Sequence, residues 1–74
     1  MRITSDRGVL TAVVNEIDEA LTVTWIRGLH TANVTLEGRE VDCFTFDWDQ
    51  EWVTQFRFTK ALENYIADLD LDSL

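Results

Sequence analysis

Several residue types are scarce in this 74-residue chain, and each scarcity excludes a class of protein. Cys43 is the only cysteine, so no disulfide can form within the chain, and a cysteine-based zinc site would need ligands from another chain. The glycines stand isolated at positions 8, 28 and 38, which excludes the glycine-rich loops that bind phosphate. We therefore expect a reducing, cytoplasmic location.

Long apolar segments are also missing. No run approaches the roughly 20 residues that a membrane-spanning helix needs, and the chain does not open with the basic-then-apolar pattern of a secretory leader. Hydrophobic residues nevertheless make up 46% of the chain and charged residues 27%, which is typical of a folded globular protein. We expect one small domain over residues 1–74 with a thin core, and neither secretion nor membrane insertion.

Basic side chains are outnumbered. Six Lys and Arg residues stand against fourteen Asp and Glu residues, which gives a net charge of −8. Residues 37–74 carry three basic and ten acidic side chains, against three and four in residues 1–36. Such a field repels phosphate backbones and attracts cationic surfaces. We therefore expect no direct nucleic-acid binding and a protein partner with a basic surface.

The segment from residue 7 to residue 28 fits two periods. Leu10, Ala12 and Val14 alternate as in a strand, but apolar residues of this segment also recur at helical spacing. Abundant Val and Thr, together with a polar break at 15–19 before a cleanly alternating stretch at 21–25, favour a strand hairpin. A helix at 8–20 is the alternative, and it would give the element order αβββα.

The clearest hairpin lies between residues 31 and 48. Residues 31–37 alternate between apolar and polar side chains, and Gly38 marks a tight turn over 37–40. The return strand at 41–48 places Phe44, Phe46 and Trp48 on one face and Val41 on the other.

Two elements are expected after residue 48. Alternation over residues 52–58 favours a fifth strand, whereas a helix with Asp49 as its N-cap is the alternative. From Phe58 the period changes to 3.6, which predicts an amphipathic helix over 59–69. Acidic residues at the end of that helix oppose its dipole, so we expect residues 70–74 to be a flexible tail.

The predicted fold class is α+β. It is a small antiparallel β-meander of about five strands, either a partly open barrel or a curved sheet, packed by one C-terminal amphipathic helix. The expected core face of the strands comprises Leu10, Ala12, Val14, Leu21, Val23, Trp25, Ala32, Val34, Leu36, Phe44, Phe46, Trp48, Phe56 and Phe58.

One acidic group has the spacing of a metal site. Asp47, Asp49 and Glu51 are two residues apart, so on an extended segment they could share a calcium or magnesium ion. An EF-hand loop starting at Asp47 would need glycine where Trp52 stands and glutamate where Phe58 stands. A solvated turn explains the pattern better, so we predict no metal site.

No catalytic set is visible either. His30 is the only histidine and Cys43 the only thiol, and neither has convergent partners in the sequence. We interpret them as a loop residue and a strand residue. The sequence thus predicts no enzyme and no cofactor.

The acidic, aromatic segment from Glu37 to Glu51 is the best candidate for a functional surface, because aromatic and charged side chains combine at binding hot spots. The first hypothesis is a non-enzymatic interaction module, a regulator or inhibitor that docks this surface onto another protein. The residues chosen for it are Asp42, Asp47, Asp49, Glu51 and Trp52.

Two other hypotheses stay open. In one, spaced carboxylates mimic nucleic acid and occupy the basic groove of a DNA- or RNA-binding protein, as phage counter-defence or host-takeover proteins do. In the other, the chain is a metal-binding domain or an enzyme subunit. A homodimer that covers the predicted fifth strand or the threonine-rich face is compatible with all three hypotheses, since exposed strand edges and a thin core both invite pairing.

Overall fold

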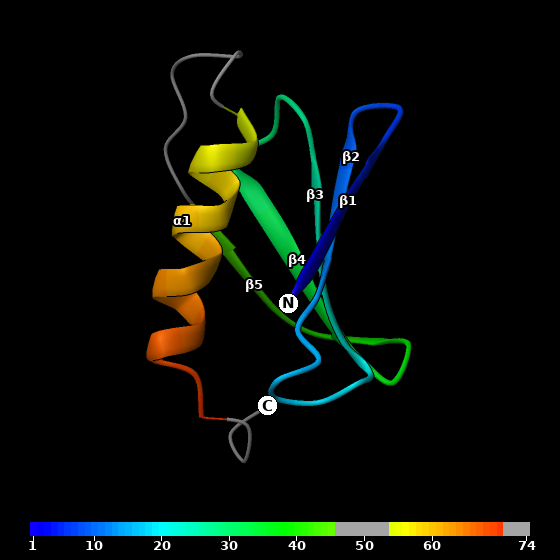
Figure 1. The fold of residues 1–74 in the computed structure, drawn as a ribbon, viewed down its shortest axis with the longest axis vertical. Coiled ribbons are helices and arrows are strands. Elements are labelled where there is room, and N and C mark those ends of the chain that lie inside the picture. The colour runs from blue at the N-terminus through cyan, green and yellow to red at the C-terminus, as the bar shows by residue number, and fades with distance from the viewer. Residues whose placement is uncertain (46–53, 71–74) are drawn as a thin grey trace.

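The computed structural model describes residues 1–45 and 54–70, and it shows one antiparallel sheet with one helix packed on it (Figure 1). The strands are β1 (Arg2–Asp6), β2 (Val9–Val13), β3 (Leu21–Ile26), β4 (Thr31–Leu36) and β5 (Arg39–Thr45), and the helix is α1 (Thr54–Ala67). They follow each other across the sheet in chain order, so β1 and β5 are its two edges. The predicted α+β meander is confirmed, as an open curved sheet and not a closed barrel.

The β1–β2 and β4–β5 hairpins have the same type of turn. In both, two residues connect the strands, and both have positive φ: 52° and 81° at Arg7 and Gly8, and 55° and 79° at Glu37 and Gly38. These are the values of a type I′ turn, whose twist matches that of the flanking strands. The turn predicted at Gly38 is confirmed, whereas β1 and the turn at Gly8 were not predicted.

The predicted fifth strand at 52–58 is wrong wherever it can be checked, because residues 54–58 form the first turns of α1. Phe56 and Phe58 show why alternation misled. Side chains two residues apart share a face in a strand but lie on nearly opposite faces of a helix. Accordingly Phe58 is fully buried, whereas Phe56 is 62% exposed and does not belong to the core. The alternative helix start at Asp49 lies outside the described residues.

The alternative order αβββα is also wrong, since residues 9–13 form β2 and pair with strands on both sides. The rest of the predicted core face is largely confirmed. The buried cluster comprises Leu10, Ala12, Val14, Leu21, Val23, Trp25, Ala32, Val34, Phe58 and Leu62. Phe44 and Leu36 pack against it half-buried, and the expected core positions Phe46 and Trp48 lie outside the described residues.

Trp25 is the centre of this cluster. It is fully buried and its ring stacks on that of Phe58, with the ring centroids 5.9 Å apart. Its indole N–H donates a hydrogen bond of 2.6 Å to the carbonyl of Leu29, so the polar end of a buried aromatic is satisfied. Contact with Phe58 joins β3 to α1 and fixes the helix on the sheet.

A β-bulge interrupts β5. Val34 pairs with Asp42 and Thr35 pairs with Glu40, so Val41 has no direct partner on β4. The extra residue changes which side chains face the helix. Val41 packs against the core, which corrects the prediction that it lies on the opposite face, and Asp42 stands opposite a core valine.

Candidate interaction surface

Asp42 is the one predicted site residue that the structure describes, and it joins β5 to α1. The Tyr65 hydroxyl on the helix donates a hydrogen bond of 2.7 Å to Oδ2 of Asp42. The backbone N–H of Cys43 donates to Oδ1 at 2.8 Å. Asp42 is half-buried, and both of its carboxylate oxygens have donors within the chain. Its position in the structure indicates that it orients Tyr65.

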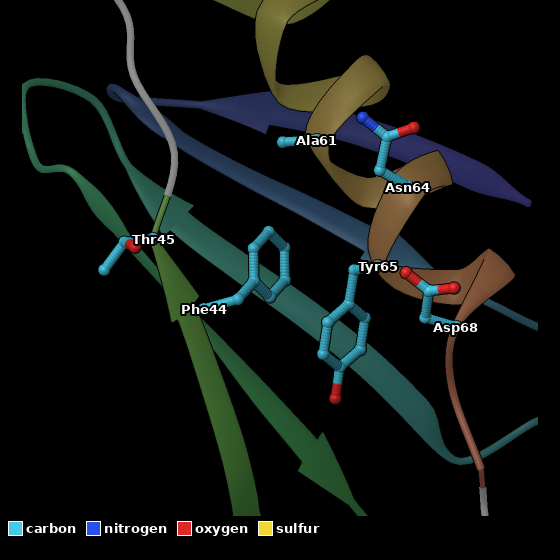
Figure 2. A pocket seen from close by; sticks show the side chains of 6 residues that line it. All are labelled: Phe44, Thr45, Ala61, Asn64, Tyr65 and Asp68. Carbon is cyan, nitrogen blue, oxygen red and sulfur yellow. The ribbon is translucent and has the colours of Figure 1, made fainter.

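Tyr65 is held from two sides. Its ring stacks on Phe44 of β5 with the centroids 4.6 Å apart and the planes inclined by 17°, as Figure 2 shows. Burial raises the pKa of Tyr65 well above its usual range, and the hydrogen bond to the Asp42 carboxylate raises it further. Tyr65 therefore stays a neutral donor at physiological pH.

A shallow groove of about 330 Å³ lies beside this ring pair, between β5 and α1. Figure 2 shows the six side chains that line it, with the two rings side by side between the strand and the helix; they are Phe44, Thr45, Ala61, Asn64, Tyr65 and Asp68. We call it the β5–α1 groove. Asp68 is the first residue after the helix, and it gives an aromatic groove one carboxylate.

Acidic residues gather at one end of the described structure. That end comprises the β2–β3 connection, the β4–β5 turn and the end of α1, which all lie in the lower half of Figure 1, the turn at the right and the helix end at the left. A hydrogen bond of 3.2 Å from the Glu37 N–H to the Ala20 carbonyl joins the first two. We call this region the acidic end; its acidic residues are Glu16, Asp18, Glu19, Glu37, Glu40, Asp68 and Asp70.

Few positive charges balance the acidic end. Its basic side chains are Arg2 and Arg39. The amino group of Met1 donates to Glu16 at 2.9 Å, and this hydrogen bond lowers the pKa of the Glu16 carboxyl. At the opposite end of the strands, Arg7 lies in the β1–β2 turn directly after Asp6, and Arg27 follows the end of β3. The chain's acidity is thus divided along the strand direction among the described residues, and not only between the two halves of the sequence.

The other predicted site residues, Asp47, Asp49, Glu51 and Trp52, lie outside the described residues. Sequence reasoning missed Phe44, Tyr65 and Asp68 as a surface group, because they come from a strand and from the end of a distant helix. A signal was present for Tyr65: it belongs to the predicted helical stripe, and its hydroxyl needs a polar partner at the sheet.

The remaining candidates for chemistry stay separate. Within residues 1–45 and 54–70, no group of three or more His, Cys, Asp or Glu side chains is placed to hold a metal ion. His30 is exposed at the start of β4, and the free Cys43 thiol is exposed on β5. The described part of the chain contains no helix with the length and apolar character needed to cross a membrane.

Comparison with known proteins gave no match: no protein-family model fits this sequence, and no curated protein or solved structure is significantly similar to the chain.

Proposed function

We propose that this protein is a non-enzymatic interaction module, a regulator or inhibitor that docks its acidic end and the adjoining β5–α1 groove onto a basic surface of another protein. One observation carries the proposal: Asp68 belongs both to the acidic end and to the lining of a groove formed by two stacked aromatic rings. Charge and aromatic surface are therefore contiguous, as they are at many binding hot spots.

The two parts have different tasks in this proposal. The exposed carboxylates of the acidic end attract a cationic partner over a distance of about one Debye length, roughly 8 Å at physiological salt. The groove then receives one Lys or Arg side chain of that partner. Its aliphatic stem lies against the rings of Phe44 and Tyr65, and its charged head reaches the Asp68 carboxylate.

Asp42 supports the groove in this proposal and does not contact the partner. Its carboxylate accepts the Tyr65 hydrogen bond and keeps the ring in place beside Phe44. Asp47, Asp49, Glu51 and Trp52 stay in the proposal as partner-binding residues on the strength of the sequence alone. A cytoplasmic location is part of the proposal as well; the exposed free thiol of Cys43 supports it, since such a thiol persists in a reducing compartment.

A selection from a random displayed-peptide library tests the proposal with a defined probe. We expect the enriched peptides to contain Lys or Arg. Their affinity should fall about tenfold for Asp68→Asn, which corresponds to one charge-assisted contact. Glu63→Gln is the matched control, because it removes the same charge from an exposed position on α1 that faces Lys60 instead of the groove.

Two results would reject the proposal. In one, the enriched peptides lack basic residues. In the other, Asp68→Asn and Glu63→Gln weaken binding equally, which would show that the loss of affinity comes from the change in net charge and not from the groove. Competition by duplex DNA or RNA for a captured partner would instead favour the nucleic-acid mimic, whose binding should fall steeply with added salt.

A further inference from the structure

The free edge of β1 is exposed and regular. β1 lies at one side of the sheet, and among residues 1–45 and 54–70 it pairs with β2 alone, through five consecutive residue pairs without a bulge. Four of its five residues are exposed, and only Ile3 is half-buried. An exposed edge strand of this kind presents unpaired backbone N–H and C=O groups to any other strand that fits it.

Proteins usually block such edges with a bulge, a proline or an inward-pointing charge. The other edge strand, β5, has two of these devices: the bulge at Val41 and the half-buried carboxylate of Asp42. The Cys43 N–H on β5 already donates to that carboxylate. β1 has no bulge and no proline, and its two charges stand at its ends, at Arg2 and Asp6.

The sequence of β1, RITSD, is complementary to itself in the antiparallel direction. With Thr4 opposite Thr4 of a second copy, Arg2 stands opposite Asp6 of that copy, and Asp6 opposite its Arg2. Neither Arg2 nor Asp6 makes an ion pair with another described residue of its own chain. Opposite charges directly across an antiparallel pair are stabilising, and a two-fold axis through Thr4 forms both pairs at once.

We propose that two copies of this chain pair through β1 in this register and form a continuous ten-stranded antiparallel sheet. The register keeps the faces consistent. Ile3 and Ser5 pair with core-face residues of β2. In the dimer, Ile3 of one copy stands opposite Ser5 of the other copy. The core faces of both copies therefore lie on the same side of the ten-stranded sheet. Ile3, half-buried in one copy, gains cover from the second.

Charge distribution favours this arrangement over other pairings of so acidic a protein. β1 is electrically balanced, with Arg2 against Asp6, whereas β5 carries Arg39 against Glu40 and Asp42. Because the strands pair antiparallel, the acidic ends of the two copies point in opposite directions. Their repulsion is therefore lower than in a parallel arrangement. The dimer presents two acidic ends, although its formation does not depend on what these ends bind.

A charge exchange tests the pairing. Sedimentation velocity should show a concentration-dependent dimer for the unmodified chain. Arg2→Asp and Asp6→Arg each place like charges opposite each other twice, so each variant alone should raise the dissociation constant at least about tenfold. A mixture of the two variants restores opposite charges at both positions. It should form a heterodimer, and the double variant should dimerise with itself.

Arg39→Asp and Glu40→Arg on β5 are the matched controls, since they make the same charge changes on the other edge strand; both should leave the dimer intact. Hydrogen exchange of the unmodified chain gives a readout that needs no variant: amide protection should rise with protein concentration in β1 and not in β5. A monomer at every concentration, concentration-independent exchange in β1, or equal effects of the β1 and β5 variants would each overturn the proposal.

Discussion

Strands β1 and β5 close the two sides of the same sheet, and they are built differently. β5 is joined to α1 by the Asp42–Tyr65 hydrogen bond and by the stacking of Phe44 on Tyr65. It also carries a bulge. β1 has a regular ladder to β2 and one half-buried apolar residue, and among the described residues no hydrogen bond or ring contact joins it to the helix. One edge is therefore packed against the helix, and the other is the edge that we propose pairs with a second copy.

The difference shows how a small domain distributes its stability. The described core is concentrated between the central strands and α1, where Trp25 meets Phe58, and it extends to β5 through the Phe44–Tyr65 pair. Few buried side chains remain for β1, because a chain of this length buries only about 60% of the surface that its unfolded form exposes. A second copy is one physical solution to that shortage.

The largest expected effect comes from separating the helix from the sheet. Phe58→Ala should lower the free energy of unfolding by about 3–5 kcal/mol, because it leaves a cavity beside Trp25. For a domain of this size, that change leaves much of the protein unfolded. Ile3→Ala on β1 should lower it by only roughly 1–2 kcal/mol, since Ile3 is half-buried.

Urea denaturation at dilute protein concentration measures both variants. Equal losses for Phe58→Ala and Ile3→Ala would contradict the contrast between the two sides of the sheet.

The next effect concerns the hydrogen bond that closes the β5 side. Tyr65→Phe removes the donor to Asp42 and keeps the ring on Phe44, so we expect a loss of about 1 kcal/mol. Asp42→Ala should cost a similar amount, and the double variant should cost less than the sum of the two single losses. Additive losses in this double-mutant cycle would show that the hydrogen bond does not stabilise the fold. Asp6→Ala on β1 is the control and, at a protein concentration low enough to keep the chain monomeric, should change the free energy of unfolding little.

The two type I′ turns allow β1 and β5 to be tested with the same substitution, because both turns have a glycine in the same conformation. Gly8→Ala and Gly38→Ala each place a Cβ on a residue with φ near 80°, so each should cost about 1 kcal/mol. Steric crowding adds little, since the new Cβ at Gly8 would approach the Arg27 Cβ only to 3.9 Å and that at Gly38 meets nothing within 4 Å. A much smaller loss at Gly8 would mean that the β1–β2 hairpin is partly open in the isolated chain.

The smallest expected effect is a loss of stability at alkaline pH. The folded state raises the pKa of Tyr65 above its ordinary value of 10.0, mainly through burial. The unfolded state therefore releases this proton first, and the contribution of Tyr65 to stability, complete below pH 10, is lost as the pH rises above that value. Between roughly pH 8 and pH 11, the urea concentration at the midpoint of unfolding should fall more for the unmodified chain than for Tyr65→Phe. Parallel curves for the two proteins would refute this assignment.

The strand pattern of the N-terminal part could be predicted because alternation has a local cause. From Leu10 to Leu36, one face is buried and the other is polar, so a period of two is visible in the sequence. The positive φ required at Gly38 is equally local. β1 escaped prediction because four of its five residues are exposed, and an edge strand with so little burial shows hardly any pattern.

The candidate surface was predictable only in its charge. Net acidity and the presence of aromatic residues follow from composition, which no fold can change. The division of the acidic residues along the strand direction depends on the fold, which brings the β2–β3 connection, the β4–β5 turn and the end of α1 to the same end of the structure, although these segments are far apart in the chain.

A small, acidic α+β meander with a C-terminal helix could be predicted from the amino-acid sequence, because burial periodicity and charge are properties of neighbouring residues. Tertiary structure decided where the helix begins and which way individual side chains face. Phe56 and Phe58 alternate like strand residues but lie in α1, since packing of Phe58 on Trp25 overrides the local pattern. The bulge at Val41 places Asp42 within reach of Tyr65, a contact between residues 23 positions apart that no local pattern encodes.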